Sequence, residues 1–147
     1  MKQIFSMTLA ASLLASVSAY AADFKPAIIY DLGGKFDKSF NEGVFNGGTK
    51  YAKEAGVELR DFEIQNDTQR EQALRKFAGD GNNPIVVPGF AWATALEKIA
   101  GEFPKTNFAI LDMVVDKPNV ASIVFKEQEG SFVVGVMAAK ASKSGKV

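Results

Sequence analysis

The chain has 147 residues, of which 47% are hydrophobic, and this is enough for one domain with a core of its own. Its 17 basic and 17 acidic side chains cancel and are well mixed, so no charged block predicts a nucleic acid or an anionic membrane as partner. The sequence contains neither cysteine nor histidine. Disulfides, thiolate nucleophiles, Ser-His-Asp triads and zinc sites built from Cys or His are therefore excluded.

Residues 1–21 have the pattern of a secretory signal peptide. Lys2 supplies a positive start, residues 4–17 form an apolar stretch, and Ala19-Tyr20-Ala21 is a small-x-small cleavage site. We predict cleavage after Ala21, with an uncleaved anchor helix as the alternative. Because no cysteine is present at that site, the sequence predicts an exported periplasmic protein that is not lipid-anchored through an N-terminal Cys.

From residue 25 onward, short strand-like runs alternate with helix-like patterns. This alternation predicts the α/β class, with a Rossmann-like parallel sheet flanked by helices. The expected strands are residues 27–30, 57–64, 85–87, 108–111 and 120–125. The expected helices are 39–55, 68–79, 92–103 and 130–142. The first two helices open on Ser/Thr-x-x-Glu, so Ser39 and Thr68 are predicted to cap them.

The last residues, 145–147, look like the beginning of a sixth strand. A chain that stops there, directly after a helix, looks interrupted. We therefore expect residues 22–125 to form the N-terminal α/β lobe of a longer protein. Residues 126–147 would then be a crossover helix and the start of a second lobe.

Several residues with chemically useful side chains follow the predicted strands. The carboxyl ends of parallel strands meet at one edge of a sheet, where α/β proteins hold their ligands, so these residues are expected to converge. They are Asp31 after the first strand, Gly89 and Phe90 after the third, and Asp112 after the fourth. Carboxylates and an aromatic ring suit a flat, polar, hydroxyl-bearing small molecule.

Phe40 and Asn41, at the start of the first helix, are expected to face the same crevice. Other interpretations of these side chains remain open. Phe40 could be a core or staple residue, Asn41 an ordinary first-turn residue, and either aspartate a turn-bracing group. The pair Asp31 and Asp112 could instead serve acid-base chemistry in a small exported α/β hydrolase-like enzyme, which is the alternative function.

The run from Asp31 to Asn41, Asp-Leu-Gly-Gly-Lys-Phe-Asp-Lys-Ser-Phe-Asn, closely resembles the signature of the basic membrane protein family. This family comprises substrate-binding proteins of ABC transporters and includes the purine nucleoside receptors. Matching stretches follow in the family's order: Gly89-Phe90, Phe108 to Asp112, Glu129 to Phe132 with Gly135, and Ser142 to Val147. The similarity covers the whole mature chain, and its first motif is specific.

The resemblance implies a type I periplasmic binding protein, in which two Rossmann-like lobes close on a ligand. By analogy with nucleoside-binding members, Asp31 and Asn41 would contact the base and Phe40 would stack on it. Asp112 would hold ribose hydroxyls. The family's remaining contacts lie in sequence beyond Val147.

The resemblance also implies the partners. These are a purine nucleoside or related purine as ligand, and an ABC permease of the inner membrane. The protein is expected to be a monomer, not an enzyme, and to need no cofactor or metal. Lipid-anchored members of the family carry a cysteine that this sequence lacks, which favours a freely diffusing periplasmic form.

Overall fold

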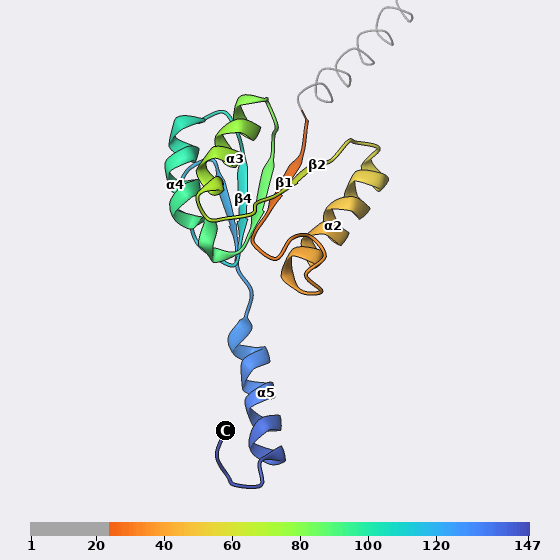
Figure 1. The fold of residues 1–147 in the computed structure, drawn as a ribbon, viewed down its shortest axis with the longest axis vertical. Helices are drawn as coiled ribbons and strands as arrows, with labels where there is room; N and C mark the ends of the chain where they lie inside the picture. The colour runs from red at the N-terminus through yellow and green to blue at the C-terminus, as the bar shows by residue number, and fades with distance from the viewer. Residues whose placement is uncertain (1–23) are drawn as a thin grey trace, which may run out of the picture.

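The structure, a computed structural model, describes residues 24–147, and the predicted signal peptide lies outside the described residues. Five strands alternate with helices, as the sequence pattern predicts (Figure 1). The strands are β1 (Ala27–Tyr30), β2 (Arg60–Glu63), β3 (Ile85–Pro88), β4 (Phe108–Leu111) and β5 (Val120–Ile123). The helices are α2 (Phe40–Ala55), α3 (Gln69–Gly79), the short 3-10 helix η1 (Phe90–Trp92), α4 (Ala93–Glu102) and α5 (Glu127–Ala141).

All strand pairs in the sheet are parallel, and the strand order is β2-β1-β3-β4-β5. This confirms the predicted α/β class. The wholly apolar β3 lies in the middle of the sheet, where Ile85, Val87 and Pro88 are buried and Val86 is partly buried. The more polar β2 lies at an edge, and it is shorter than the expected run of residues 57–64.

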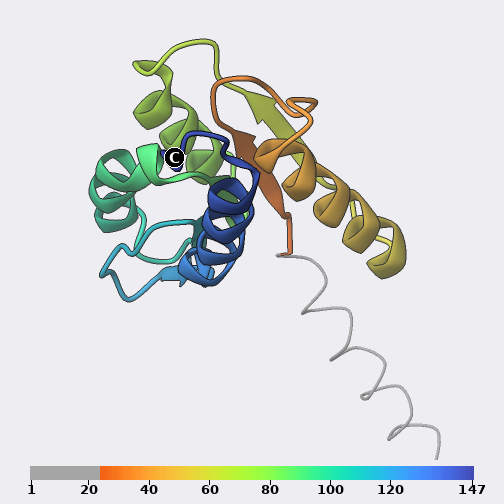
Figure 2. The same cartoon turned by 90° about the horizontal axis from the view of Figure 1, so that it is seen from below.

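The two faces of the sheet are covered by different helices (Figures 1 and 2). Alternate strand residues such as Ile29, Val87 and Ile110 point toward α3 and α4 and form the buried core with them. Trp92 belongs to this core and is fully buried. The intervening residues, such as Ile28, face α2, where Gly48 allows close approach because a Cβ there would lie 2.5 Å from Ile28 Cδ1.

The last helix, α5, extends away from the sheet, and none of its residues is buried (Figure 1). It begins four residues after β5, which ends at Ile123 rather than at the expected residue 125. The predicted sixth strand is not formed, since residues 142–147 follow α5 as irregular chain without a neighbouring strand to pair with. In residues 24–147, no helix is both long enough and apolar enough to span a membrane.

Ser39 and Thr68 stand at the N-cap positions of α2 and α3, as predicted, but the predicted capping bonds are not made. Neither Ser39 nor Thr68 makes a side-chain hydrogen bond that caps its helix. The Thr68 hydroxyl donates instead to Asn66 Oδ1, at 2.6 Å. Glu71, its expected partner, pairs with Lys98 on α4. Because Ser and Thr side chains also bond well within turns, a capping pattern predicts where a helix begins better than it predicts which bond is made.

Candidate functional site

Asp31, Gly89 and Asp112 follow three strands that are adjacent in the sheet, and the structure places them together at its carboxyl edge. The backbone N–H of Gly89 donates to the carbonyl of Leu111, at 3.0 Å. A Cβ on Gly89 would lie only 3.2 Å from Asp31 Oδ2. These contacts join the loops after β1, β3 and β4 into one surface.

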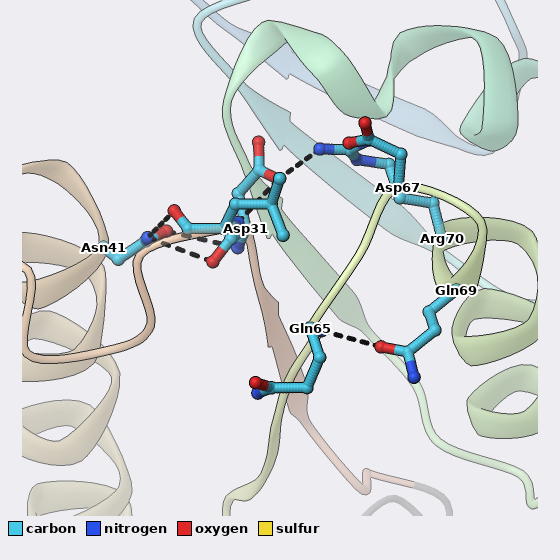
Figure 3. A network of polar contacts seen from close by, with 7 residues as sticks. Asp31, Asn41, Gln65, Asp67, Gln69 and Arg70 are labelled. Atoms are coloured by element: carbon cyan, nitrogen blue, oxygen red, sulfur yellow. Dashed lines mark hydrogen bonds and ion pairs between the residues drawn. The ribbon is translucent and has the colours of Figure 1, made fainter.

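The loop after β1 is held by the side chain of Asn41, which is only 3% exposed. Its Oδ1 accepts from the backbone N–H of Asp31, at 3.3 Å, and its Nδ2 donates to the carbonyls of Asp31 and Leu32 (Figure 3). Both amide protons of Asn41 are therefore used within the loop. Oδ1 accepts this one hydrogen bond among the described residues, and its second lone pair has no partner there.

The start of α2 is capped by Asp37. Its carboxylate accepts from the backbone N–H groups of Ser39, Asn41 and Glu42, at 2.8 to 3.2 Å. Loss of hydration alone would raise the pKa of Asp37, but these N–H donors outweigh it and hold the pKa below the usual value for aspartate. Glu42 in turn accepts from the N–H of Lys38, so two carboxylates fix the geometry around Phe40.

The glycine pair of the loop allows it to be tied to the edge strand β2. Gly34 has a φ of +73°, which favours glycine, and a Cβ there would displace the Glu63 carboxylate, whose Oε2 lies 2.3 Å from that position. Next to it, the N–H of Lys35 donates to the same Glu63 oxygen, at 3.1 Å, and Lys35 Nζ pairs with Asp61 at 2.7 Å. The loop is thus attached to β2 on one side and to α2 on the other.

Arg70, in the first turn of α3, is a site residue that the sequence reading missed. Its guanidinium donates to Asp31 Oδ1 and to Asp67 Oδ1 (Figure 3). It also lies over the indole ring of Trp92. Burial alone would lower the pKa of Arg70, but the hydrogen bonds to Asp31 and Asp67 more than compensate and raise it. No local pattern could have identified it, because its partner Asp31 lies 39 residues earlier.

Asp112 adopts a left-handed backbone conformation, with a φ of +70°. This region is uncommon for residues other than glycine, although aspartate tolerates it better than most. The N–H of Asp112 donates to the carbonyl of Ile123, at 2.8 Å, which fixes the backbone at this point. The backbone position from which the Asp112 carboxylate projects is therefore fixed by this hydrogen bond.

The two predicted aromatic contacts differ in their surroundings. Phe90, at the start of η1, is 68% exposed. Phe40 is 38% exposed and packs edge-on against Phe125, with ring centroids 6.3 Å apart. Phe40 also borders an open apolar groove of about 640 Å³ between α2 and the sheet. Its described lining is Ser39, Phe40, Gly43, Val44, Gly47, Val86, Ala109, Leu111, Ile123 and Phe125.

Metal chemistry finds no support at this edge. Among the described residues, no cluster of three or more Asp, Glu, His or Cys side chains could hold a metal ion. Asp31 is committed to Arg70, and Asp37 to the helix start. Asp31 and Asp37 thus act as hydrogen-bond acceptors within the protein.

Comparison with known proteins identifies the family to which a chain with this site belongs. Residues 25–147 match the family model described as ABC transporter substrate-binding protein PnrA-like, or Bmp. The chain belongs to the Bmp family. Within the Bmp family, it is 32% identical over 130 residues to an ABC transporter nucleoside-binding protein of Lactococcus lactis. That match covers 85% of this chain and 37% of the relative.

Two further matches cover a similar part of this chain. An uncharacterized lipoprotein of Pyrococcus furiosus is 32% identical over 117 residues, covering 78% of this chain and 29% of that protein. A solved ABC transporter solute-binding protein of Aeropyrum pernix superposes with a TM-score of 0.74 at 33% identity, covering 79% and 32% of the two chains. The chain therefore spans about a third of the length of these relatives.

Proposed function

We propose that this Bmp-family protein captures a purine nucleoside, or a related purine, for an ABC importer. The observation that carries the proposal is the carboxyl edge of the sheet. There Asp31 and Asp112 offer acceptors beside the exposed ring of Phe90. Base and ribose supply the N–H and O–H donors that carboxylates accept, and a purine supplies a face on which a ring stacks. The relative from Lactococcus lactis, named as nucleoside-binding, supports the same ligand class.

The residues have distinct roles in this proposal. Asp31 accepts from the base, and Asn41 holds the loop that carries Asp31. A base contact of Asn41 itself, as in nucleoside-binding members of the family, would use the second lone pair of its Oδ1. Phe40 and Phe90 supply aromatic surface. Asp112 accepts from ribose hydroxyls, and Gly89 lets the ligand and Asp31 approach the backbone closely.

The described edge of the sheet can contact a nucleoside from one side only, and a second protein surface is needed to enclose the ligand. We propose that residues 22–125 form one lobe and that residues 126–147 lead into another, which closes over the ligand by a hinge motion. An exported, monomeric, non-enzymatic receptor that delivers its ligand to a membrane permease fits the family. The hydrolase alternative finds no support, because the family consists of substrate-binding proteins and Asp31 Oδ1 is already bonded to Arg70.

Titration calorimetry of the purified protein tests the proposal. The panel is adenosine, guanosine, inosine, cytidine, adenine and ribose. Purine nucleosides are expected to bind at one per chain without being converted, while cytidine and ribose bind much more weakly. Formation of a product from any of them, or equal binding across the panel, would contradict the proposal. An Asp112→Ala variant with undiminished affinity for nucleosides would remove the ribose role of that residue.

Phe90→Ala tests the stacking role directly. Loss of an aromatic ring that stacks on a base costs about 1–3 kcal/mol, so affinity should fall by about five- to 150-fold. The matched control is Phe36→Ala, because Phe36 is similarly exposed but packs against Phe45 on α2. Neither variant should unfold the protein.

A further inference from the structure

Arg70 connects three segments that follow three neighbouring strands. Arg70 and Asp67 come from the connection after β2, Asp31 from the loop after β1, and Trp92 from η1 after β3. The guanidinium bonds to both aspartates (Figure 3). It also lies over the indole, with its Cζ 5.5 Å from the ring centroid. Arg70 is therefore a cross-link at the edge of the sheet where the ligand is proposed to bind.

The contact with Arg70 determines which oxygen of Asp31 is free. Oδ1 accepts from Arg70 Nη2, at 2.5 Å, and from the backbone N–H of Leu32, at 2.8 Å. Two bonds use both lone pairs of that oxygen. Oδ2 is the atom that faces Gly89, where the missing Cβ leaves room. The carboxylate thus has one committed oxygen and one that is available.

A purely structural role does not explain this arrangement well. Arg75, on the same helix, already ties α3 to α4 through a two-pronged contact with Glu102 at the surface. Arg70 is instead only 9% exposed, and its Nε has no hydrogen-bond partner among the described residues. Burying an arginine with an unused donor is unfavourable, which points to a requirement at the edge itself.

We propose that Arg70 is a positioning residue that orients Asp31, so that Oδ2 alone meets the ligand and the site selects a hydrogen-bond donor at that point. The inference rests on the proposed nucleoside function, and it gives a structural cause for the preference of the site for one nucleoside over another. Holding the side chain in one rotamer before binding also removes an entropy loss that would otherwise oppose binding.

The cross-link makes an unusual prediction for Asp31→Asn. Arg70 and the Leu32 N–H can only donate, so the amide oxygen must face them and the NH₂ group must take the place of Oδ2. The available group then changes from an acceptor to a donor. Adenosine and inosine carry opposite donor and acceptor patterns at N1 and the 6-position, so the variant should prefer whichever of the two the native protein disfavours.

The reversal should depend on Arg70. In the double variant Asp31→Asn, Arg70→Met, only the Leu32 N–H still favours that orientation of the amide, so the reversed preference should be weakened. Arg70→Met alone should weaken binding of the preferred nucleoside by about three- to tenfold, from the added cost of ordering one side chain. The control Arg75→Met removes a salt bridge from the same helix and should leave affinity unchanged.

A measurement without ligand separates this inference from the proposed function. NMR coupling constants should report a single χ1 rotamer for Asp31 in the native protein and in Arg75→Met, but averaged values in Arg70→Met. Urea unfolding establishes that each variant is folded. If Asp31 keeps one rotamer in a folded Arg70→Met protein, or if Asp31→Asn preserves the native preference, the positioning role is wrong. If no purine nucleoside binds the native protein, the proposed function fails, while the rotamer measurement still decides the role of Arg70.

Discussion

On one face of the sheet, α3 and α4 bury a continuous core in which Leu74, Leu96 and Ile99 have no exposed surface. On the other face, α2 covers β1 and β3, and its only buried residue is Asn41. Beyond it, Ile123 and Phe125 are about half exposed beside the apolar groove. The closed face therefore supplies most of the hydrophobic stabilisation, because that stabilisation scales with the apolar area removed from water.

This difference bears on how the site is built. Arg70 and Trp92 belong to elements of the closed face, and both reach the edge where Asp31 lies. The parts of the site that need fixed geometry are thus anchored on the better-packed side. Phe40, by contrast, stands over the open groove, where its surroundings constrain it less.

The largest expected effect comes from a cavity on the closed face. Leu96→Ala should lower the free energy of unfolding by about 2–5 kcal/mol, because the surrounding core cannot collapse to fill the space. Phe125→Ala, on the open face, removes a larger side chain but only one edge-on aromatic contact, worth about 1 kcal/mol or less. Urea unfolding of both variants measures the difference. Equal losses would show that the two faces contribute alike.

A smaller effect is expected from Gly89→Ala. Gly89 has a φ of +102°, and alanine there should destabilise the protein by about 1–3 kcal/mol through backbone strain. The new Cβ would also press on Asp31 Oδ2, so nucleoside affinity should fall. Gly47→Ala is the matched control in α2. A Cβ there meets nothing within 4 Å, so the helix should gain about 0.5–1 kcal/mol. A Gly89→Ala protein as stable as the native one would refute the strain argument.

The smallest effect is expected from the cap of α2. Asp37→Ala should lower the melting temperature at neutral pH, whereas Ser39→Ala should leave it unchanged because the Ser39 side chain makes no cap bond. The pKa of Asp37 is lowered in the folded protein, so its contribution is present above the ordinary aspartate pKa. It is lost as the pH falls through the lowered folded value.

Melting curves recorded from neutral to acidic pH check this sign. The difference between the native protein and Asp37→Ala should shrink as the pH drops and should disappear once Asp37 is protonated. A difference that stays constant with pH would mean that the carboxylate charge of Asp37 does not stabilise the helix start. An effect of Ser39→Ala as large as that of Asp37→Ala would restore the cap predicted from the sequence.

Much of the fold is readable from local pattern. The apolar run Ala27–Tyr30 and the wholly apolar Ile85–Val87 predict strands whose ends meet, and this places Asp31 beside Gly89. The membership of the family is likewise readable from one loop. These features are determined by residues close together in sequence, because hydrophobic periodicity and turn residues are local signals for strands, helices and loops.

What could not be predicted depends on contacts across the fold. Ser39 and Asp37 are both reasonable caps, and only the path of the loop decides that Asp37 lies under the helix N–H groups. Arg70 looks like an ordinary surface residue of an amphipathic helix. Its burial follows from Asp31 and Trp92, which lie far from it in sequence but adjacent in the sheet.

The edge strand β2 has a consequence for the behaviour of the protein in concentrated solution. An edge strand presents unpaired backbone groups to which a strand of another molecule can add. On β2, three of four residues, Arg60, Asp61 and Glu63, are charged, and Lys35 lies against two of them. The opposite edge, β5, carries no charge in Val120–Ile123. Strand-to-strand association between two copies is therefore expected to begin at β5, and the lysine that anchors the glycine loop also helps to protect β2 from aggregation.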